Sequence, residues 1–166
     1  MADRLAEIVA ECKRQQESCN YTSTALYSWV KEVRVYRVAF IALPIIFGSL
    51  ASAKILLKDP DWDWLTAIAA LLAGLFPAIF KALDLDQSIK AMSDSAHRFE
   101  NLRDRFRQAA LITSTGPLEE LEEQFKPLME SMEDARTASL AIPERHFKIA
   151  QKKIGGGHYD FDADKK

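Results

Sequence analysis

Two long apolar stretches that contain no charged residue constrain this chain more than any other feature of its sequence. The first stretch covers residues 38–53 and the second covers residues 64–80. They contain 16 and 17 residues, which span roughly 25 Å as α-helix at about 1.5 Å per residue. Because the hydrocarbon core of a bilayer is roughly 30 Å thick, both stretches are close to the length of a membrane span.

The two stretches lack the polar stripe that a helix on the surface of a soluble bundle normally keeps. The polar residues in and beside them are few: Ser49, Ser52, Thr66 and the edge residue Lys54. A lysine side chain can extend outward to the interface, so the first span can continue to residue 57. We therefore predict transmembrane helices at 38–57 and 64–83. Burial of both helices in the core of a soluble bundle is the alternative.

The linker between the spans is short, which predicts a hairpin with both chain ends on one side of the membrane. It covers residues 58–63, where Pro60 would end the first helix and Trp62 and Trp64 suit a membrane interface. Basic residues flank the other ends of the spans: Lys31, Arg34 and Arg37 before the first, and Lys81, Lys90 and Arg98 after the second. The positive-inside rule then places both termini in the cytoplasm. A long charged segment precedes the first span, so we expect no signal peptide.

Small residues recur at four-residue spacing in both spans. The pairs are Gly48 with Ser52, Ala70 with Gly74, and Gly74 with Ala78. Such spacing lets helix backbones approach closely in lipid, either within one hairpin or between chains. Pro44 and Pro77 each remove a backbone hydrogen bond and can kink a span, so we mark them as candidate gate positions.

Outside the two spans, the sequence predicts helices and no strands. Residues 3–37 show helical spacing of apolar residues with a weak region around Gln15, Gln16 and Ser23, where we expect a bend or a break. We predict a further helix at residues 84–113, which has an apolar seam and ends at the break 114–117. The seam contains Ile89, Met92, Ala96, Phe99, Leu102, Phe106 and Ala109. A basic helix at 143–153 begins with Pro143, and three glycines at 155–157 end it. We predict an all-α domain over residues 1–155, with a mobile tail at 156–166.

The helix that starts near Leu118 has an unusually regular apolar seam. Its members alternate at three and four residues: Leu118, Leu121, Phe125, Leu128, Met132, Ala135, Ser139 and Ile142. This is the heptad spacing of coiled-coil packing, and it can serve packing within the subunit or assembly between subunits. Pro127 lies inside the seam, so we expect a kink or a restart of the helix there.

Composition and motifs exclude several function classes. The chain has 22 Lys+Arg and 24 Asp+Glu, a net charge of -2, which lacks the basic excess of a nucleic-acid binder. Cys12 and Cys19 share a helix face but lie about 10 Å apart along it, beyond the reach of a disulfide. No catalytic constellation, zinc spacing or phosphate loop is present. We therefore expect no enzyme activity, no metal and no cofactor.

The order of these features resembles the SLATT family, the SMODS- and SLOG-associating two-transmembrane effector domains of prokaryotic conflict systems. The resemblance covers roughly residues 20–155. It is carried by two spans with a short linker, by Gly48–Ser52 (GSLAS) in the first span and by Ala70–Leu75 (ALLAGL) in the second. Residues 97–102 (HRFENL) and the helix start at 142–144 are also similar to the family, although the aromatic Phe99 departs from its usual spacing.

The resemblance implies a membrane effector of an antiphage conflict system. Such proteins are proposed to oligomerise in the inner membrane and permeabilise it on a cytoplasmic signal, so that the infected cell dies or stops growing. A nucleotide-signal synthase, a SLOG sensor or a reverse transcriptase would be encoded nearby. Ser49, Ser52 and Thr66 would then line a pore, with Lys54 near its outer mouth. A membrane scaffold that does not permeabilise, or a soluble helical adaptor, is the alternative.

Overall fold

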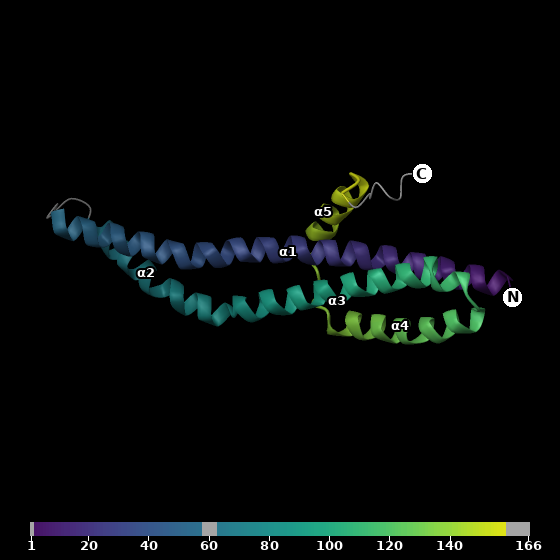
Figure 1. The fold of residues 1–166 in the computed structure, drawn as a ribbon. Helices are drawn as coiled ribbons and strands as arrows, with labels where there is room; N and C mark the ends of the chain where they lie inside the picture. The colour runs from purple at the N-terminus through teal and green to yellow at the C-terminus, as the bar shows by residue number, and fades with distance from the viewer. Residues whose placement is uncertain (1, 58–62, 159–166) are drawn as a thin grey trace. The chain divides into compact units, whose positions relative to one another are not determined.

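The computed structural model describes residues 2–57 and 63–158, and its regular elements are helices (Figure 1). The elements are α1 (Ala2–Leu57), α2 (Asp63–Leu83), α3 (Leu85–Leu111), the short 3-10 helix η1 (Thr113–Thr115), α4 (Leu118–Ala138) and α5 (Glu144–Gly155). No strand occurs among the described residues, so the predicted all-α fold class is confirmed. The linker at 58–62, with Pro60 and Trp62, and the tail from residue 159 lie outside the described residues.

Helix α1 runs without interruption from Ala2 to Leu57, so of the expected bend or break near Gln15 the break does not occur. The helix continues through the region where the apolar spacing is weak, because polar side chains of that region have hydrogen-bond partners in the fold. Gln15 is buried, donates to Glu11 at 2.6 Å and accepts a hydrogen bond from Arg136 of α4 at 3.0 Å. The buried Ser23 hydroxyl donates to the carbonyl oxygen of Asn20 at 3.2 Å.

The chain divides into two compact units, which share α1. The first unit contains the described residues of 2–30 and 91–158, and the second contains those of 31–90. The first unit therefore holds the start of α1, most of α3, and α4 and α5. The second unit holds the two apolar stretches predicted from the sequence.

A single apolar core joins α1, α3 and α4 in the first unit, where α4 runs back alongside α3 (Figure 1). The members with the largest buried side chains are Leu26, Phe99, Phe106, Leu121 and Met132. The predicted seam of α3 is buried from Met92 to Ala109. The heptad seam of α4 also faces this core, so its central part serves packing within the subunit.

Two expectations for this segment differ from the structure: the extent of the seam, whose last members Ser139 and Ile142 lie beyond α4, and a restart of the helix at Pro127. The helix ends at Ala138, so Ser139 follows the helix as its C-cap and does not extend the seam as a helical residue. Pro127 causes no restart, because α4 is one helix from Leu118 to Ala138. Pro127 lies on the exposed side of the helix. The missing amide and the ring of this proline therefore disturb no core contact.

Helix α5 starts one residue later than predicted, with Pro143 as the residue before its first turn. The backbone of Pro143 is extended, at φ -61° and ψ 138°, which places it outside the helix. The helix ends at the predicted glycines, and Gly157 has a positive φ of 77°, a conformation that glycine adopts at little steric cost. The buried residues of α5 are His146 and Ala150.

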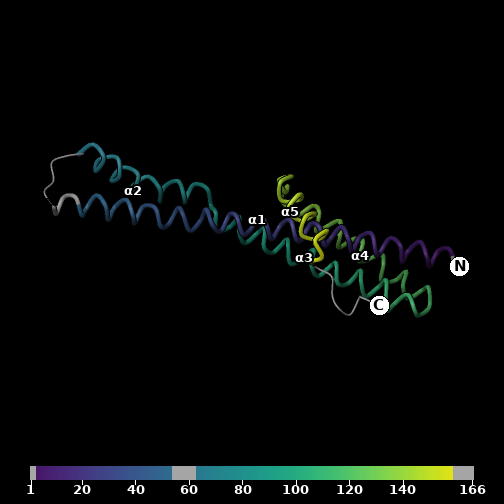
Figure 2. Tube along the Cα trace, turned by 90° about the horizontal axis from the view of Figure 1, so that it is seen from above, coloured from purple at the N-terminus to yellow at the C-terminus, as the bar shows by residue number. Residues whose placement is uncertain are grey.

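In the second unit, the last part of α1 and α2 form an antiparallel hairpin (Figure 2). Phe76 of α2 packs against two aromatic rings of α1, with its centroid 5.7 Å from that of Phe40 and 6.1 Å from that of Phe47. Arg37 forms an ion pair with Asp86 at 2.6 Å. Asp84 separates α2 from α3 with a positive φ of 43°, so α3 begins at Leu85 and not at the predicted residue 84.

Burial of Cys19 in the first core predicts a dependence of stability on alkaline pH. Burial raises the pKa of the Cys19 thiol from 9.0 to about 11, and Arg136 and Arg103 oppose this shift. The folded state thus holds the thiol proton more tightly than the unfolded state does. Its stabilising contribution is complete below pH 9 and is lost as the pH rises toward 11.

We expect the free energy of unfolding of the wild-type chain to fall by on the order of 2 kcal/mol more than that of Cys19→Ala between pH 8 and 11. Urea unfolding followed by circular dichroism in detergent measures both values. The alanine variant is the control, because the other titrating groups are common to the two chains. If the free energy of unfolding depended on pH in the same way for both proteins, the raised pKa of the Cys19 thiol would be contradicted.

Candidate functional site

The second unit exposes large apolar side chains along both of its long helices. On α1 they are Val35, Val38, Ile41, Ile45, Ile46 and Leu50, and on α2 they are Trp64, Leu65, Ile68, Leu71, Leu75, Ile79 and Leu83. In the most apolar 18-residue segment of each of these two helices, only 6% is buried within the protein. Soluble monomers rarely expose contiguous apolar patches larger than a few hundred Å², so this surface requires a nonaqueous environment or a protein partner.

This exposure contradicts the alternative in which the two stretches are core helices of a soluble bundle. A core helix would be covered by the other helices of its own chain, whereas these are covered over a small fraction of their length. The structure thus contains two helices that are long and apolar enough to cross a membrane. Trp64, one of the predicted interface residues, lies in the first turn of α2 with 61% of its surface exposed.

A cavity of about 320 Å³ lies between the two helices of the hairpin. Its lining is apolar apart from one threonine: Phe47, Leu50, Ala51, Leu65, Thr66, Ile68, Ala69 and Leu72. Ala51 is the described residue of this unit that is most deeply buried, at 8% exposed. Thr66, predicted to face a pore, therefore lies at the contact between the two helices.

Ser49 and Ser52, the other predicted pore residues, are exposed and do not line this cavity. Each hydroxyl donates to the carbonyl oxygen four residues earlier, Ser49 to Ile45 at 2.7 Å and Ser52 to Gly48 at 2.9 Å. These bonds satisfy the hydroxyl protons inside the helix. The structure consequently does not bring Thr66 together with the two serines in one hairpin. The Lys54 side chain lies outside the described residues.

Two of the predicted small packing residues, Gly48 and Gly74, have no close neighbour on another helix among the described residues. A Cβ atom built on Gly48 or on Gly74 would meet no atom within 4 Å. Ala70 and Ala78, which flank Gly74 at four-residue spacing, are exposed. In the described part of the hairpin, aromatic and aliphatic side chains make the contact between the helices. Contact between chains stays a prediction.

The two candidate gate prolines lie within continuous helices. Pro44 is inside α1 and Pro77 is inside α2, and neither ends its helix. Pro77 is exposed, whereas Pro44 is partly covered. A proline inside a span leaves one carbonyl of the preceding turn without its helical donor. Both positions therefore keep the weakened backbone that the gate prediction requires, while the gating role stays a prediction.

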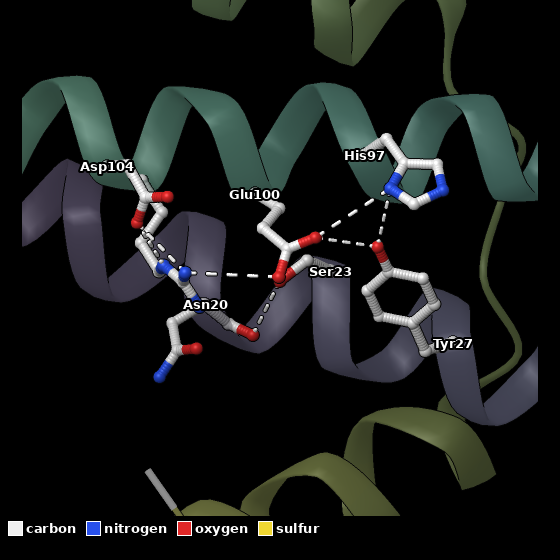
Figure 3. A network of polar contacts seen from close by, with 7 residues as sticks. Asn20, Ser23, Tyr27, His97, Glu100 and Asp104 are labelled. Atoms are coloured by element: carbon white, nitrogen blue, oxygen red, sulfur yellow. Dashed lines mark hydrogen bonds and ion pairs between the residues drawn. The ribbon is translucent and has the colours of Figure 1, made fainter. Parts of the chain in front are cut away.

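A polar contact joins α1 to α3 in the first unit (Figure 3). The Tyr27 hydroxyl donates to Oε2 of Glu100 at 2.7 Å, and its oxygen lies 2.9 Å from Nδ1 of His97. Because the hydroxyl proton is directed to the carboxylate, the oxygen accepts from Nδ1–H of His97. The rings of Tyr27 and His97 also meet edge to face at 5.6 Å.

The same contact extends along α3. Arg103 lies 3.9 Å from the Glu100 carboxylate and forms a hydrogen-bonded ion pair with Asp104 at 2.9 Å (Figure 3). His97 thus takes part in a hydrogen bond and a ring contact of the first unit. The contact matters because α1 carries the first apolar stretch, and α3 follows the second after the turn at Asp84.

Sequence reasoning missed His146, which is 1% exposed. Its Nδ1 lies 2.8 Å from the Ser28 hydroxyl, and its ring stacks on Trp29 with centroids 6.2 Å apart. Ser28 also donates to the Ala25 carbonyl at 3.0 Å, so Nδ1 of His146 is the donor in the shared hydrogen bond. The available signal was the spacing of His146 and Ala150, four residues apart on one helix face.

Neither contact assembles a metal or nucleophile site. Among the residues that the structure describes, no group of three His, Cys, Asp or Glu side chains lies close enough to hold a metal ion. Burial also raises the pKa of the Cys12 thiol, with a smaller effect from Glu11. A raised pKa lowers the thiolate fraction at neutral pH, so neither cysteine is activated as a nucleophile.

No protein family, curated protein or solved structure matches this chain. The resemblance to the SLATT family thus rests on the ordered sequence features described above. The structure adds the exposed apolar hairpin and the helical first unit as independent physical constraints on function.

The contact between α1 and α3 can be tested with a double-mutant cycle on Tyr27→Phe and Glu100→Gln. We expect a coupling of about 1 kcal/mol in the free energy of unfolding, because the hydroxyl donates to a charged acceptor at a partly exposed site. Urea unfolding in detergent gives the three differences that the cycle needs. Tyr21→Phe is the matched control, since Tyr21 has no hydrogen bond to any residue that the structure describes. Strict additivity of the two changes would refute the contact.

Proposed function

We propose that the chain is a membrane protein in which α1 and α2 cross the bilayer as a hairpin. The exposed apolar surface of the second unit is the observation that carries this proposal, because lipid would cover side chains that the protein leaves uncovered. Backbone amides and carbonyls in the spans are satisfied within the helices, as the bilayer core requires, except for the carbonyls that lose their donor at Pro44 and Pro77. The basic residues before α1's apolar stretch and after that of α2 support a cytoplasmic location for both termini in the inner membrane.

We further propose that several copies assemble through the outward small residues of the hairpin. Gly48 and Gly74 have open space where a side chain would be, so another backbone can approach there closely. In lipid, close packing of small residues is one of the main attractions between helices. One two-helix hairpin cannot enclose water, so any pore would require such an assembly. Ser49 and Ser52, which are exposed, would supply weakly polar groups to its lining.

The function that fits this arrangement is a membrane effector of a prokaryotic antiphage conflict system. A cytoplasmic signal would change the assembly or the tilt of the hairpins and permeabilise the inner membrane. The first unit would receive that signal, and its contact between Tyr27 and Glu100 links the two helices that lead to the spans. The SLATT resemblance supports the effector role and a partner such as a nucleotide-signal synthase, a SLOG sensor or a reverse transcriptase.

The substitution Gly74→Leu tests contact between chains, because we expect it to leave the fold of the hairpin itself unchanged. Beyond the backbone of α2 and the two neighbouring residues, no described atom lies within 4 Å of a Cβ built there, so we expect the variant to insert and fold like the wild type. Between chains, the same side chain would hold the backbones apart. We expect dye release from proteoliposomes to fall at least tenfold and the oligomer mass in detergent to decrease.

Leu75→Phe is the matched control, because it adds bulk at the neighbouring exposed position without filling the glycine site. It should leave leakage and mass unchanged. Assembly without dye release under every candidate trigger would favour a scaffold that does not permeabilise. A wild-type chain that stays monomeric in bilayers, or that purifies as a monodisperse protein without detergent, would overturn the proposal.

A further inference from the structure

Helix α5 concentrates positive charge in a chain that is acidic overall. Four basic residues, Arg145, Lys148, Lys152 and Lys153, share its 12 residues with one acidic residue, Glu144. The chain as a whole has a net charge of -2, so the remainder is more acidic than the total. A basic helix in such a chain can attract an anionic surface locally.

The packing of α5 determines which of its faces is accessible. His146 and Ala150 are buried, and His146 holds the helix to α1 through Ser28 and Trp29. The opposite face consists of exposed residues at three- and four-residue spacing: Arg145, Lys148, Ile149 and Lys152. Lys148 also reaches Glu144 at 2.8 Å, but both side chains are at least 70% exposed, so this ion pair contributes little to stability.

An apolar side chain lies among the cations of this outward face. Ile149 has 41% of its surface exposed between Lys148 and Lys152. Lysine and arginine beside an exposed aliphatic residue are characteristic of helices that lie in the interface of an anionic membrane. The cations contact phosphate headgroups, and the aliphatic side chain enters the boundary with the acyl chains.

The attachment of α5 to α1 gives a reason to choose lipid as the partner. Ser28 and Trp29 precede Arg37, the last charged residue before the apolar stretch, by about two helical turns along α1. The segment of α1 that contacts α5 is thus close in sequence to a proposed span, as are the cytoplasmic polybasic segments that bind anionic headgroups.

We propose that the outward face of α5 binds anionic phospholipid headgroups of the cytoplasmic leaflet. This inference rests on the proposed membrane hairpin and adds a second, peripheral contact with the bilayer. Each cation near an anionic surface strengthens binding by roughly fivefold, and the effect decays within a Debye length of about 10 Å at 0.1 M salt. The contact would therefore depend on lipid charge and on ionic strength.

Hydrogen exchange of the full chain in nanodiscs tests this proposal. Peptides that cover residues 144–155 are compared in discs of phosphatidylglycerol and of phosphatidylcholine, at 50 mM and 500 mM NaCl. We expect exchange in α5 to be at least fivefold slower in the anionic discs at low salt, and the difference to disappear at high salt. Peptides of α4, which lies in the same core, should show no lipid dependence.

The triple variant Arg145→Gln, Lys148→Gln and Lys152→Gln should remove the lipid difference. A matched control, Lys13→Gln, Arg105→Gln and Lys126→Gln, removes the same charge from exposed positions outside α5 and should retain it. Equal exchange of wild-type α5 in both lipids at low salt would overturn the proposal, and so would loss of the difference in the control. Incorporation of the chain into discs tests the hairpin separately, so a failure of α5 to respond is distinguishable from a failure of the membrane assignment.

Discussion

The exclusion of apolar side chains from water is the constraint on which the rest of this structure depends. The first unit meets it internally, because α1, α3 and α4 bury their seams against one another. The second unit does not, since its two helices cover each other along a narrow contact and expose the rest. One chain thus combines a core that is complete in itself with a surface that requires lipid or other copies.

Helix α1 contributes both to the buried core of the first unit and to the exposed apolar surface of the second, because it belongs to both units. Its first part carries polar and small side chains that fit a protein core, such as Gln15, Cys19 and Ser23. Its last part carries isoleucine, leucine and phenylalanine without an internal polar stripe. The same backbone hydrogen bonds suit both environments, because an α-helix satisfies its own amides and carbonyls in water and in lipid.

The breaks in the other helices are equally informative. Asp84 adopts a positive φ between α2 and α3. Helix α1, in contrast, continues without interruption from the first unit into the second. A single non-glycine residue in this conformation costs free energy, and turns and hinges are common places for it. The chain therefore passes between the two units as one continuous helix in α1, whereas a turn at Asp84 separates α2 from α3.

The two apolar stretches, the seam of α3 and the heptads of α4 could be predicted because periodicity and charge are local properties of the sequence. The tertiary structure decided what is not local. Ser28 and His146 form a buried pair although 118 residues separate them, and no pattern in either segment indicates the other. The outward position of Gly48 and Gly74 likewise depends on which helix face meets its neighbour, a choice made by Phe40, Phe47 and Phe76. Sequence alone determined which segments avoid water, whereas only packing decided which of their faces remain uncovered, because a face is buried by residues distant in the chain.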